Sequence, residues 1–232
     1  MPQGTPHIPM AGATSAAANG TVEPMDATPS SAVPPKDLLA FCENWNTAIL
    51  TGEQAPSTVN ASVLRLLSLC AALTDAHAAV EVGSHGGTTG LALFEGMASE
   101  GVLTSVEPDP ERLRVAKEAF SAAEIGHART RLIAADPHDV LSRLTDGHYD
   151  LFLSAGRPAD HMAFAEQSAR LLRPGGIAVF LDVADAADPA RREPDQLAVR
   201  AFTEVMQNDE KWLTTLLPLA DGVLVAVLRP QD

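Results

Sequence analysis

A glycine-rich turn stands directly after a short apolar run, and this pairing is typical of a site for a small-molecule cofactor. The run is 78–82 (AAVEV), and Gly83, Gly86 and Gly87 follow it closely. A buried strand that passes through such a turn into a helix lets the backbone approach a ligand, with the free N–H groups of the helix start facing it. The stretch 78–89 therefore predicts a bound small molecule at the end of a strand.

Two glutamates mark the ends of neighbouring predicted strands. Glu81 lies inside the apolar run, where a buried carboxylate needs a polar partner. Glu107 ends a second run at 102–106 and follows Glu81 by 26 residues. In nucleotide-binding sheets an acidic residue at the end of the second strand accepts hydrogen bonds from the ribose hydroxyls. We expect Glu107 to play this part from an exposed strand end.

The dinucleotide-binding pattern G-x-G-x-x-G is absent from this turn, because position 85 is His and position 88 is Thr. The turn therefore lacks the cradle that this pattern forms around a pyrophosphate. An adenosyl ligand without phosphates is favoured, and a nicotinamide-dependent oxidoreductase is disfavoured.

Strand-like and helix-like segments alternate from residue 78 onward. Strands are predicted at 78–82, 102–106, 130–134, 149–154 and 176–181, and helices at 88–99, 110–120, 163–172 and 195–207. Thr88 or Thr89 can cap the first of these helices, and Asp109, followed by Pro110, can cap the second. The runs 212–218 and 222–228 predict a closing antiparallel hairpin. This order is typical of an α/β fold with a doubly wound, Rossmann-like sheet of seven strands, which binds ligands at the carboxyl ends of its parallel strands. A loop at 183–194, rich in Ala, Asp and Pro, is a candidate lid over that edge.

The N-terminal part differs in composition from the rest. Residues 1–35 are mostly Pro, Ala, Gly, Ser and Thr, with no Phe, Trp or Tyr. Such a segment cannot bury enough apolar surface to order itself. We therefore expect a disordered tail at 1–35 and one folded domain at 36–232. Apolar residues recur at helical spacing in the first part of that domain and predict two helices, at 38–49 and from 57 to 73.

The net charge, the cysteines and the apolar runs of the sequence indicate which partners the protein can bind and in which compartment it lies. The net charge of −14 makes nucleic acid and anionic membrane surfaces poor partners. Cys42 and Cys70 fall in apolar helical patterns and read as buried small hydrophobes in a reducing compartment. No run has transmembrane length and no export signal is evident. A cytoplasmic protein is expected.

Five features of the sequence recur together in one known family: 81–89 (EVGSHGGTT), Glu107, Asp136, 171–176 (LLRPGG) and 217–222 (LPLADG). With them the chain resembles the S-adenosylmethionine-dependent O-methyltransferases of the caffeoyl-CoA and catechol type, and most closely a bacterial branch of that family. The resemblance covers residue 57 to the C-terminus, and His85 stands where the family pattern has its middle glycine.

The resemblance implies S-adenosylmethionine as cofactor and a small hydroxylated molecule as methyl acceptor. It implies cofactor binding by Glu81, Gly83, Ser84, Gly87, Thr89, Glu107, Ala135, Asp136 and Ser154. Asp136 would accept a hydrogen bond from the adenine amine, although from the sequence alone it is equally the cap of a helix that starts at Pro137. The resemblance also makes a homodimer possible through the first two helices, whose other interpretation is plain core packing.

The metal-binding residues of that family are replaced in this chain. Metal-dependent members carry F-I/V-D-A-D-K at the fourth strand and Asp-Asn after the fifth, whereas 152–157 reads FLSAGR and 181–182 reads LD. Ser154 and Gly156 thus replace two carboxylates, and a hard cation needs several oxygen ligands at one point. We expect no metal. Arg157 stands at the family's Lys position but is a poor general base.

The catalytic residue stays open at this point. Asp182, His85 and His161 lie near predicted strand ends and are candidates for removing the acceptor proton. Each has a plainer interpretation: Asp182 as a solvated loop acid, His85 as a turn residue and His161 as a helix-surface residue. The altered metal site also allows a second function class, a non-catalytic protein that binds S-adenosylmethionine.

Overall fold

The computed structural model describes residues 38–50, 59–183 and 194–230. The tail predicted at 1–35 and nearly all of the candidate lid at 183–194 lie outside the described residues. Among the described residues, no helix is long and apolar enough to cross a membrane.

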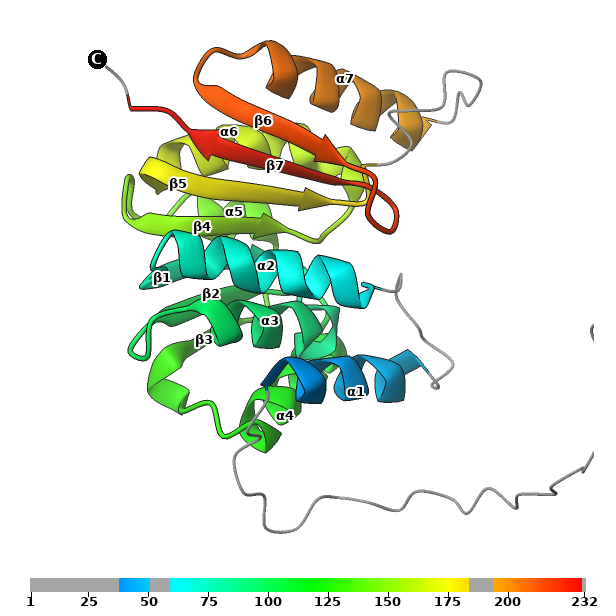
Figure 1. The fold of residues 1–232 in the computed structure, drawn as a ribbon, viewed down its shortest axis with the longest axis vertical. Coiled ribbons are helices and arrows are strands. Elements are labelled where there is room, and N and C mark those ends of the chain that lie inside the picture. Colours follow the sequence, from blue (N-terminus) through cyan, green and yellow to red (C-terminus); the bar gives the residue numbers. More distant parts are fainter. Residues whose placement is uncertain (1–37, 51–58, 184–193, 231–232) are drawn as a thin grey trace, which may run out of the picture. The chain divides into compact units, whose positions relative to one another are not determined.

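A seven-stranded sheet in the order β3-β2-β1-β4-β5-β7-β6 forms the centre of the fold (Figure 1). Strands β1 to β5 run parallel, and β7 pairs antiparallel with both β5 and β6. The doubly wound α/β sheet with a closing antiparallel hairpin is thus confirmed. The elements in chain order are α1 (Leu38–Leu50), α2 (Ala61–Leu73), β1 (Ala78–Val82), η1 (His85–Gly87), α3 (Thr88–Gly96), β2 (Val102–Val106), α4 (Pro110–Ala122), η2 (His127–Arg129), β3 (Thr130–Ile133), α5 (Pro137–Leu141), β4 (Tyr149–Ser154), η3 (Pro158–Asp160), α6 (His161–Leu171), β5 (Leu172–Leu181), α7 (Pro194–Asn208), β6 (Trp212–Leu217) and β7 (Val223–Leu228).

Helices cover both faces of the sheet and create two hydrophobic cores. Helices α1 to α4 pack on one face, where Leu93 and Leu151 are fully buried. Helices α5, α6 and α7 pack on the other face around Phe180 and Phe202. Because β1 and β4 are buried on both faces, their sequences are continuous apolar runs rather than alternating ones. Cys42 and Cys70 are buried in the first core, as expected.

Side-chain caps begin three of the helices. Asn60 accepts a hydrogen bond from the amide of Val63 at the start of α2, some residues later than predicted. Asp109 and Asp136 cap α4 and α5, each followed by a proline at the first helical position, as the sequence predicts. Both aspartates stand where a parallel strand gives way to its helix, at the carboxyl edge of the sheet.

Helix α3 begins differently from the prediction. We expected Thr88 or Thr89 to cap it, but Gly87 with a left-handed φ of 92° precedes the helix, and both threonines are fully buried in its first turn. The helix also ends earlier than expected, at Gly96, because Met97 is extended (φ −71°, ψ 155°) and starts the return to β2. The threonine side chains are therefore available to the interior rather than to the helix end.

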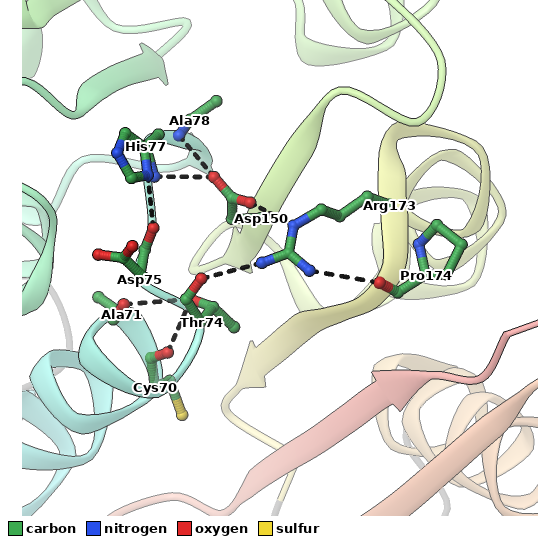
Figure 2. Close-up of polar contacts among 9 residues, drawn as sticks. All are labelled: Cys70, Ala71, Thr74, Asp75, His77, Ala78, Asp150, Arg173 and Pro174. Atoms are coloured by element: carbon green, nitrogen blue, oxygen red, sulfur yellow. Dashed lines mark hydrogen bonds and ion pairs between the residues drawn. The ribbon is translucent and has the colours of Figure 1, made fainter.

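Asp150 connects several elements at the amino-terminal edge of the sheet (Figure 2). Its carboxylate accepts hydrogen bonds from the amides of His77 and Ala78, both 2.8 Å long, and from Nε of Arg173. Arg173 also donates to the carbonyl oxygen of Thr74 at 2.9 Å. Burial opposes ionisation, but the bonds from Arg173 and the two amides outweigh it and hold the pKa of Asp150 below its usual value. The edge away from the carboxyl ends of the strands is thereby fixed.

Candidate active site

A cavity of about 680 Å³ opens at the carboxyl ends of the parallel strands. Open doubly wound sheets bind their ligands at this edge. The lining residues end β1, follow the ends of β1 to β5, or lie in the helices after them: Val82, Gly83, His85, Glu107, Pro108, Asp109, Arg112, Asp136, Pro137, His138, Ala155, Gly156, Arg157, Asp160, Phe164 and Asp182.

The glycine-rich turn after β1 lies against the end of β4. Gly83 has a φ of 83°, and a Cβ there would lie 2.6 Å from the carbonyl oxygen of Ala155, so only glycine fits. Gly87 packs as closely against α4. Trp45 of α1 donates from Nε1 to the carbonyl oxygen of Gly86 at 3.0 Å and holds the turn from outside. The turn thus presents backbone to the cavity at Gly83.

His85 occupies the position at which the family that the sequence resembles has the middle glycine of its pattern. Its backbone is left-handed (φ 43°), so the conformation that glycine favours is kept. Nε2 donates to the carbonyl oxygen of Ala155 at 2.9 Å, and the buried Nδ1 has no hydrogen-bond partner among the described residues. Burial lowers the pKa of His85, although the Ala155 carbonyl and the charge of Asp182 oppose this. A neutral imidazole therefore lines the cavity.

Glu81 finds its expected polar partners beneath this turn. The carboxyl group is fully buried and accepts hydrogen bonds from the hydroxyl of Thr89 and, at 2.7 Å, from that of Ser105. Burial raises the pKa of Glu81 to about 7, with the two hydroxyls opposing the shift and the charge of Glu107 adding to it. Glu81 thus joins β1, β2 and α3 without lining the cavity.

Glu107 lines the cavity but is only 3% exposed, so the exposed strand end that we expected is wrong. One carboxylate oxygen accepts from the amide (3.0 Å) and the hydroxyl (3.2 Å) of Ser84. The other accepts from the amide of Asp109 at 3.2 Å. The turns after β1 and β2 both donate hydrogen bonds to Glu107, and together they bury its carboxylate. A carboxylate has acceptor capacity beyond these three bonds, which is left for a ligand.

Asp136 borders the cavity beyond the end of β3. Its Oδ1 accepts from the amide of His138 at 2.8 Å, which confirms the capping role predicted from the sequence. Ala135, just before it, is half-buried and does not line the cavity. The exposed carboxylate of Asp136 can cap α5 and still accept from a ligand with its second oxygen.

His161 joins the ends of β4 and β5 behind the cavity. Its Nε2 donates to the carbonyl oxygen of Leu181 at 2.8 Å, so Nδ1 accepts from the hydroxyl of Ser154 at 3.0 Å. The ring packs against Phe180 and Phe202 and is fully buried, so the helix-surface interpretation of His161 is wrong. Burial lowers its pKa to about 4, and the imidazole is neutral at pH 7. His161 does not line the cavity, so it has a structural role and cannot take a proton from a methyl acceptor bound there.

Asp182 follows β5 directly and lines the cavity. Its backbone is left-handed (φ 59°), which is uncommon for a residue other than glycine. The neighbouring amide of Val183 bonds to the carbonyl oxygen of Gly222 at 3.2 Å, and His161 holds Leu181 on the other side. The Asp182 carboxylate is thus fixed at the wall, near enough to His85 for its charge to raise the pKa of the imidazole.

Comparison with known proteins decides the family. The family model described as O-methyltransferase matches residues 43–229. This chain belongs to the O-methyltransferase family. A protein of Mycobacteroides abscessus named "Putative O-methyltransferase" is 38% identical over 216 residues, which cover 92% of this chain and 98% of that one. A protein of the same name from Mycobacterium sp. (strain JLS) is 45% identical over 171 residues, covering 72% and 78%.

Solved structures share the fold of this O-methyltransferase. A protein of Corynebacterium glutamicum is 28% identical with a TM-score of 0.75, covering 83% of this chain and 91% of that one. An O-methyltransferase of Bacillus cereus, in complex with SAH, is 21% identical with a TM-score of 0.70, covering 84% and 92%. The resemblance and the enzyme class predicted from the sequence are confirmed, and these comparisons support neither the oxidoreductase nor the non-catalytic alternative.

The strand ends of this O-methyltransferase offer a poor donor set for a divalent cation. The described part of the chain holds no group of three or more His, Cys, Asp or Glu side chains placed to bind a metal ion. The Ser154 hydroxyl is engaged by His161 and Leu181 is apolar, which leaves Asp182 as the carboxylate at this point. A hard cation that requires several oxygens does not fit these residues.

The predicted cofactor-binding residues divide into two groups. Gly83, Glu107 and Asp136 line the cavity. The remaining six do not line it: Glu81, Ser84, Gly87, Thr89, Ala135 and Ser154. Several of these support the wall from behind, since Ser84 bonds Glu107 and Thr89 bonds Glu81. The binding roles of both groups stay predictions.

The lining residues that sequence reasoning missed include Arg112, His138, Asp160 and Phe164. Arg112 pairs with Asp109 at 3.6 Å in the first turn of α4, and His138 lies in the first turn of α5. The first helical turn after an Asp-Pro cap borders the ligand edge of such a sheet. The two Asp-Pro pairs were therefore a usable signal for Arg112 and His138, whereas Asp160 and Phe164 carried none.

Proposed function

We propose that this O-methyltransferase moves a methyl group from S-adenosylmethionine to a small hydroxylated acceptor without a resident divalent cation. The observation that carries the proposal is Glu107, held by Ser84 and Asp109 within a cavity of about 680 Å³ at the carboxyl ends of the strands. A fixed carboxylate at the end of the second strand suits the paired hydroxyls of a ribose. The SAH-bound Bacillus cereus enzyme with the same fold supports this choice of cofactor.

We assign a different part of the cofactor to each of three lining residues. Glu107 would accept from the ribose hydroxyls and Asp136 from the adenine amine, while Gly83 lets the backbone approach closely. S-adenosylmethionine supplies an activated methyl group on a sulfonium. Because the donor carries its own leaving group, the protein contributes mainly by aligning the acceptor and removing its proton.

Asp182 is the residue that we propose to receive the acceptor proton, with His85 beside it on the same wall. Arg157 on the rim is paired with Asp160 at 3.0 Å, and a guanidinium group is a poor general base, so we do not assign it this role. Since the donor set does not fit a cation that would lower the pKa of a bound hydroxyl, acidic acceptors such as substituted phenols are favoured.

Ligand binding and turnover test the proposal separately. In a thermal-shift and calorimetric panel, SAH and S-adenosylmethionine should stabilise the protein and NAD should not. Release of SAH is then measured over a series of phenols, with and without EDTA. The proposal expects EDTA to leave the rate unchanged. Binding of NAD alone would overturn the cofactor, and activity that EDTA removes and magnesium restores would overturn the metal-independent mechanism.

We further propose that residues 36–232 form the catalytic domain and that two copies can associate. Leu69 and Leu73 on α2 and Leu213 on β6 are 53%, 71% and 59% exposed, and apolar surface of this kind supports self-association. Light scattering on the full chain over a concentration series tests this. A constant monomer mass would remove the homodimer.

A further inference from the structure

A second cavity, of about 440 Å³, lies between helix α4 and strand β3 and shares no lining residue with the active-site cavity. Leu113 of α4 and Leu132 of β3 supply apolar surface to it. Arg114, Lys117 and His127 supply cationic groups, and no acidic side chain lines it. In a chain with a net charge of −14, a groove with this lining has a local charge opposite to that of the whole protein.

The basic side chains of this groove differ in how they are engaged. Arg114 pairs with Glu111 at 2.9 Å and with Glu118, so much of its charge is compensated on the helix itself. The side chains of Lys117 and His127 make no hydrogen bond or ion pair within the part of the chain that the structure describes. A carboxylate placed over the groove would therefore meet an ammonium group with no competing acid, and an imidazole that can donate to it.

The strand beside the groove also has an unpaired edge. β3 is an outer strand of the sheet, and the carbonyl oxygen of Ile133 accepts from the amide of Glu107 at 3.1 Å on the β2 side. Because backbone groups of successive residues face opposite sides of a strand, the N–H and C=O of Leu132 point away from β2. An outer strand of this kind is a template for a further strand.

We propose that the groove between β3 and α4 binds an extended acidic peptide segment of a partner protein, which adds as a strand to the edge at Leu132 and directs carboxylates to Lys117 and His127. Strand addition beside a helix derives its affinity from main-chain hydrogen bonds and its specificity from alternate side chains. A simple anion would use the cationic groups but not the backbone edge, whereas a peptide uses both features. The partner site is independent of the methyl-transfer site, with which it shares no lining residue.

The test uses a blocked octapeptide of alternating Glu and Val, and a second of alternating Lys and Val, with the full-length protein at physiological ionic strength so that net repulsion is screened. Amide hydrogen exchange should show that the Glu/Val peptide slows exchange at Leu132 and that the Lys/Val peptide does not. Lys117→Glu should weaken Glu/Val binding by about five- to tenfold, the effect of reversing one exposed charge at an interface. Lys211→Glu is the matched control, because it makes the same charge change at an exposed lysine before β6 and should leave binding unchanged.

Each other outcome overturns the proposal. No binding at about 1 mM peptide, a concentration that detects even weak complexes, removes the site. Binding without protection of Leu132, or equal binding of acetate or of the Lys/Val peptide, shows a surface charge effect and no strand addition. If Lys117→Glu and Lys211→Glu weaken binding of the Glu/Val peptide equally, the weakening comes from the change in net charge and not from the loss of a contact in the groove. SAH affinity of every variant, measured in parallel, reports on the fold and on the active site independently.

Discussion

The hydroxyl of Ser154 lies 3.0 Å from Nδ1 of His161 and donates to it. The other ring nitrogen of that histidine holds the carbonyl oxygen at the end of β5, so one neutral side chain connects the ends of β4 and β5. Asp182 is the next residue after this carbonyl, and its position at the cavity wall depends on the connection. The strand ends that carry the metal-binding residues in metal-dependent members of the family that the sequence resembles are here joined by hydrogen bonds.

Ser154→Ala should therefore lower the free energy of unfolding by about 1 to 2 kcal/mol, because it leaves a buried imidazole nitrogen without a donor. Urea denaturation of wild type and variant measures the loss. Ser168→Ala is the matched control, since Ser168 is equally buried but bonds only to the carbonyl of Ala165 in its own helix. If the two variants lose the same free energy of unfolding, the hydrogen bond to His161 contributes no more to stability than an ordinary buried hydroxyl does.

Glu81 should make stability fall as the pH rises from about 4.5 to about 7. Its pKa is raised to about 7 in the folded state from an ordinary value of 4.5, so the folded state binds a proton more tightly than the unfolded state, and the advantage is lost as that proton leaves. His161 acts in the opposite direction, because its pKa is lowered to about 4 and stability rises with pH up to its unfolded value of 6.5.

A difference measurement removes the contribution of His161. Glu81→Gln cannot ionise, so its stability relative to wild type should improve by about 2.5 kcal/mol between pH 5 and pH 8, which is most of the free-energy equivalent of this pKa shift. Chemical denaturation of both proteins across that range gives the difference. A constant difference between the two proteins would mean that the pKa of Glu81 is not raised.

The sequence predicted the sheet because the apolar runs of β1 and β4 and the Asp-Pro caps after β2 and β3 are local signals. It also predicted a partner for Glu81, since burial of a lone carboxylate is costly. It did not predict the Ser154–His161 contact, because η3 turns the chain between them and no periodicity encodes the pairing. Nor did it show that Glu107 is buried, since that depends on the turns from two different strands closing over one acid.

Glu107→Gln should weaken SAH binding by about 1.5 to 3 kcal/mol, the range for hydrogen bonds to a charged group. Glutamine is preferred to alanine here because it fills the buried position of Glu107 and keeps one acceptor oxygen, whereas alanine would leave the amides of both Ser84 and Asp109 without an acceptor. Isothermal titration calorimetry gives the affinity, and an unchanged melting temperature shows that the turns are intact. An affinity equal to that of wild type would remove the ribose assignment.

Deletion of residues 1–35 should leave the melting temperature and the SAH affinity unchanged, because the segment has few large apolar side chains, and no Leu, Phe, Trp or Tyr, with which to dock on the domain. Limited proteolysis should remove it readily from the full chain. Calorimetry of the two chains under the same conditions compares them. A fall of several degrees on deletion would show that the segment packs against the domain.

Asp182→Asn should lower the rate of methyl transfer to phenols by about 100-fold or more, the usual contribution of a positioned general base, while SAH affinity is kept. The loss should shrink for 4-nitrophenol, because an acceptor that is already ionised needs no base. His85→Gly is the companion variant. Glycine accepts the left-handed backbone of this position, so the turn and the SAH affinity should survive, and the rate should fall less than in Asp182→Asn.

The pattern across acceptors separates chemistry from packing. If Asp182 only shapes the wall, Asp182→Asn will slow phenol and 4-nitrophenol by the same factor, and the proposed role as base is wrong. If His85→Gly slows phenol more than Asp182→Asn does and has little effect on 4-nitrophenol, the imidazole rather than the carboxylate takes the proton. Its Nδ1, which has no hydrogen-bond partner among the described residues, would then be the atom that receives it.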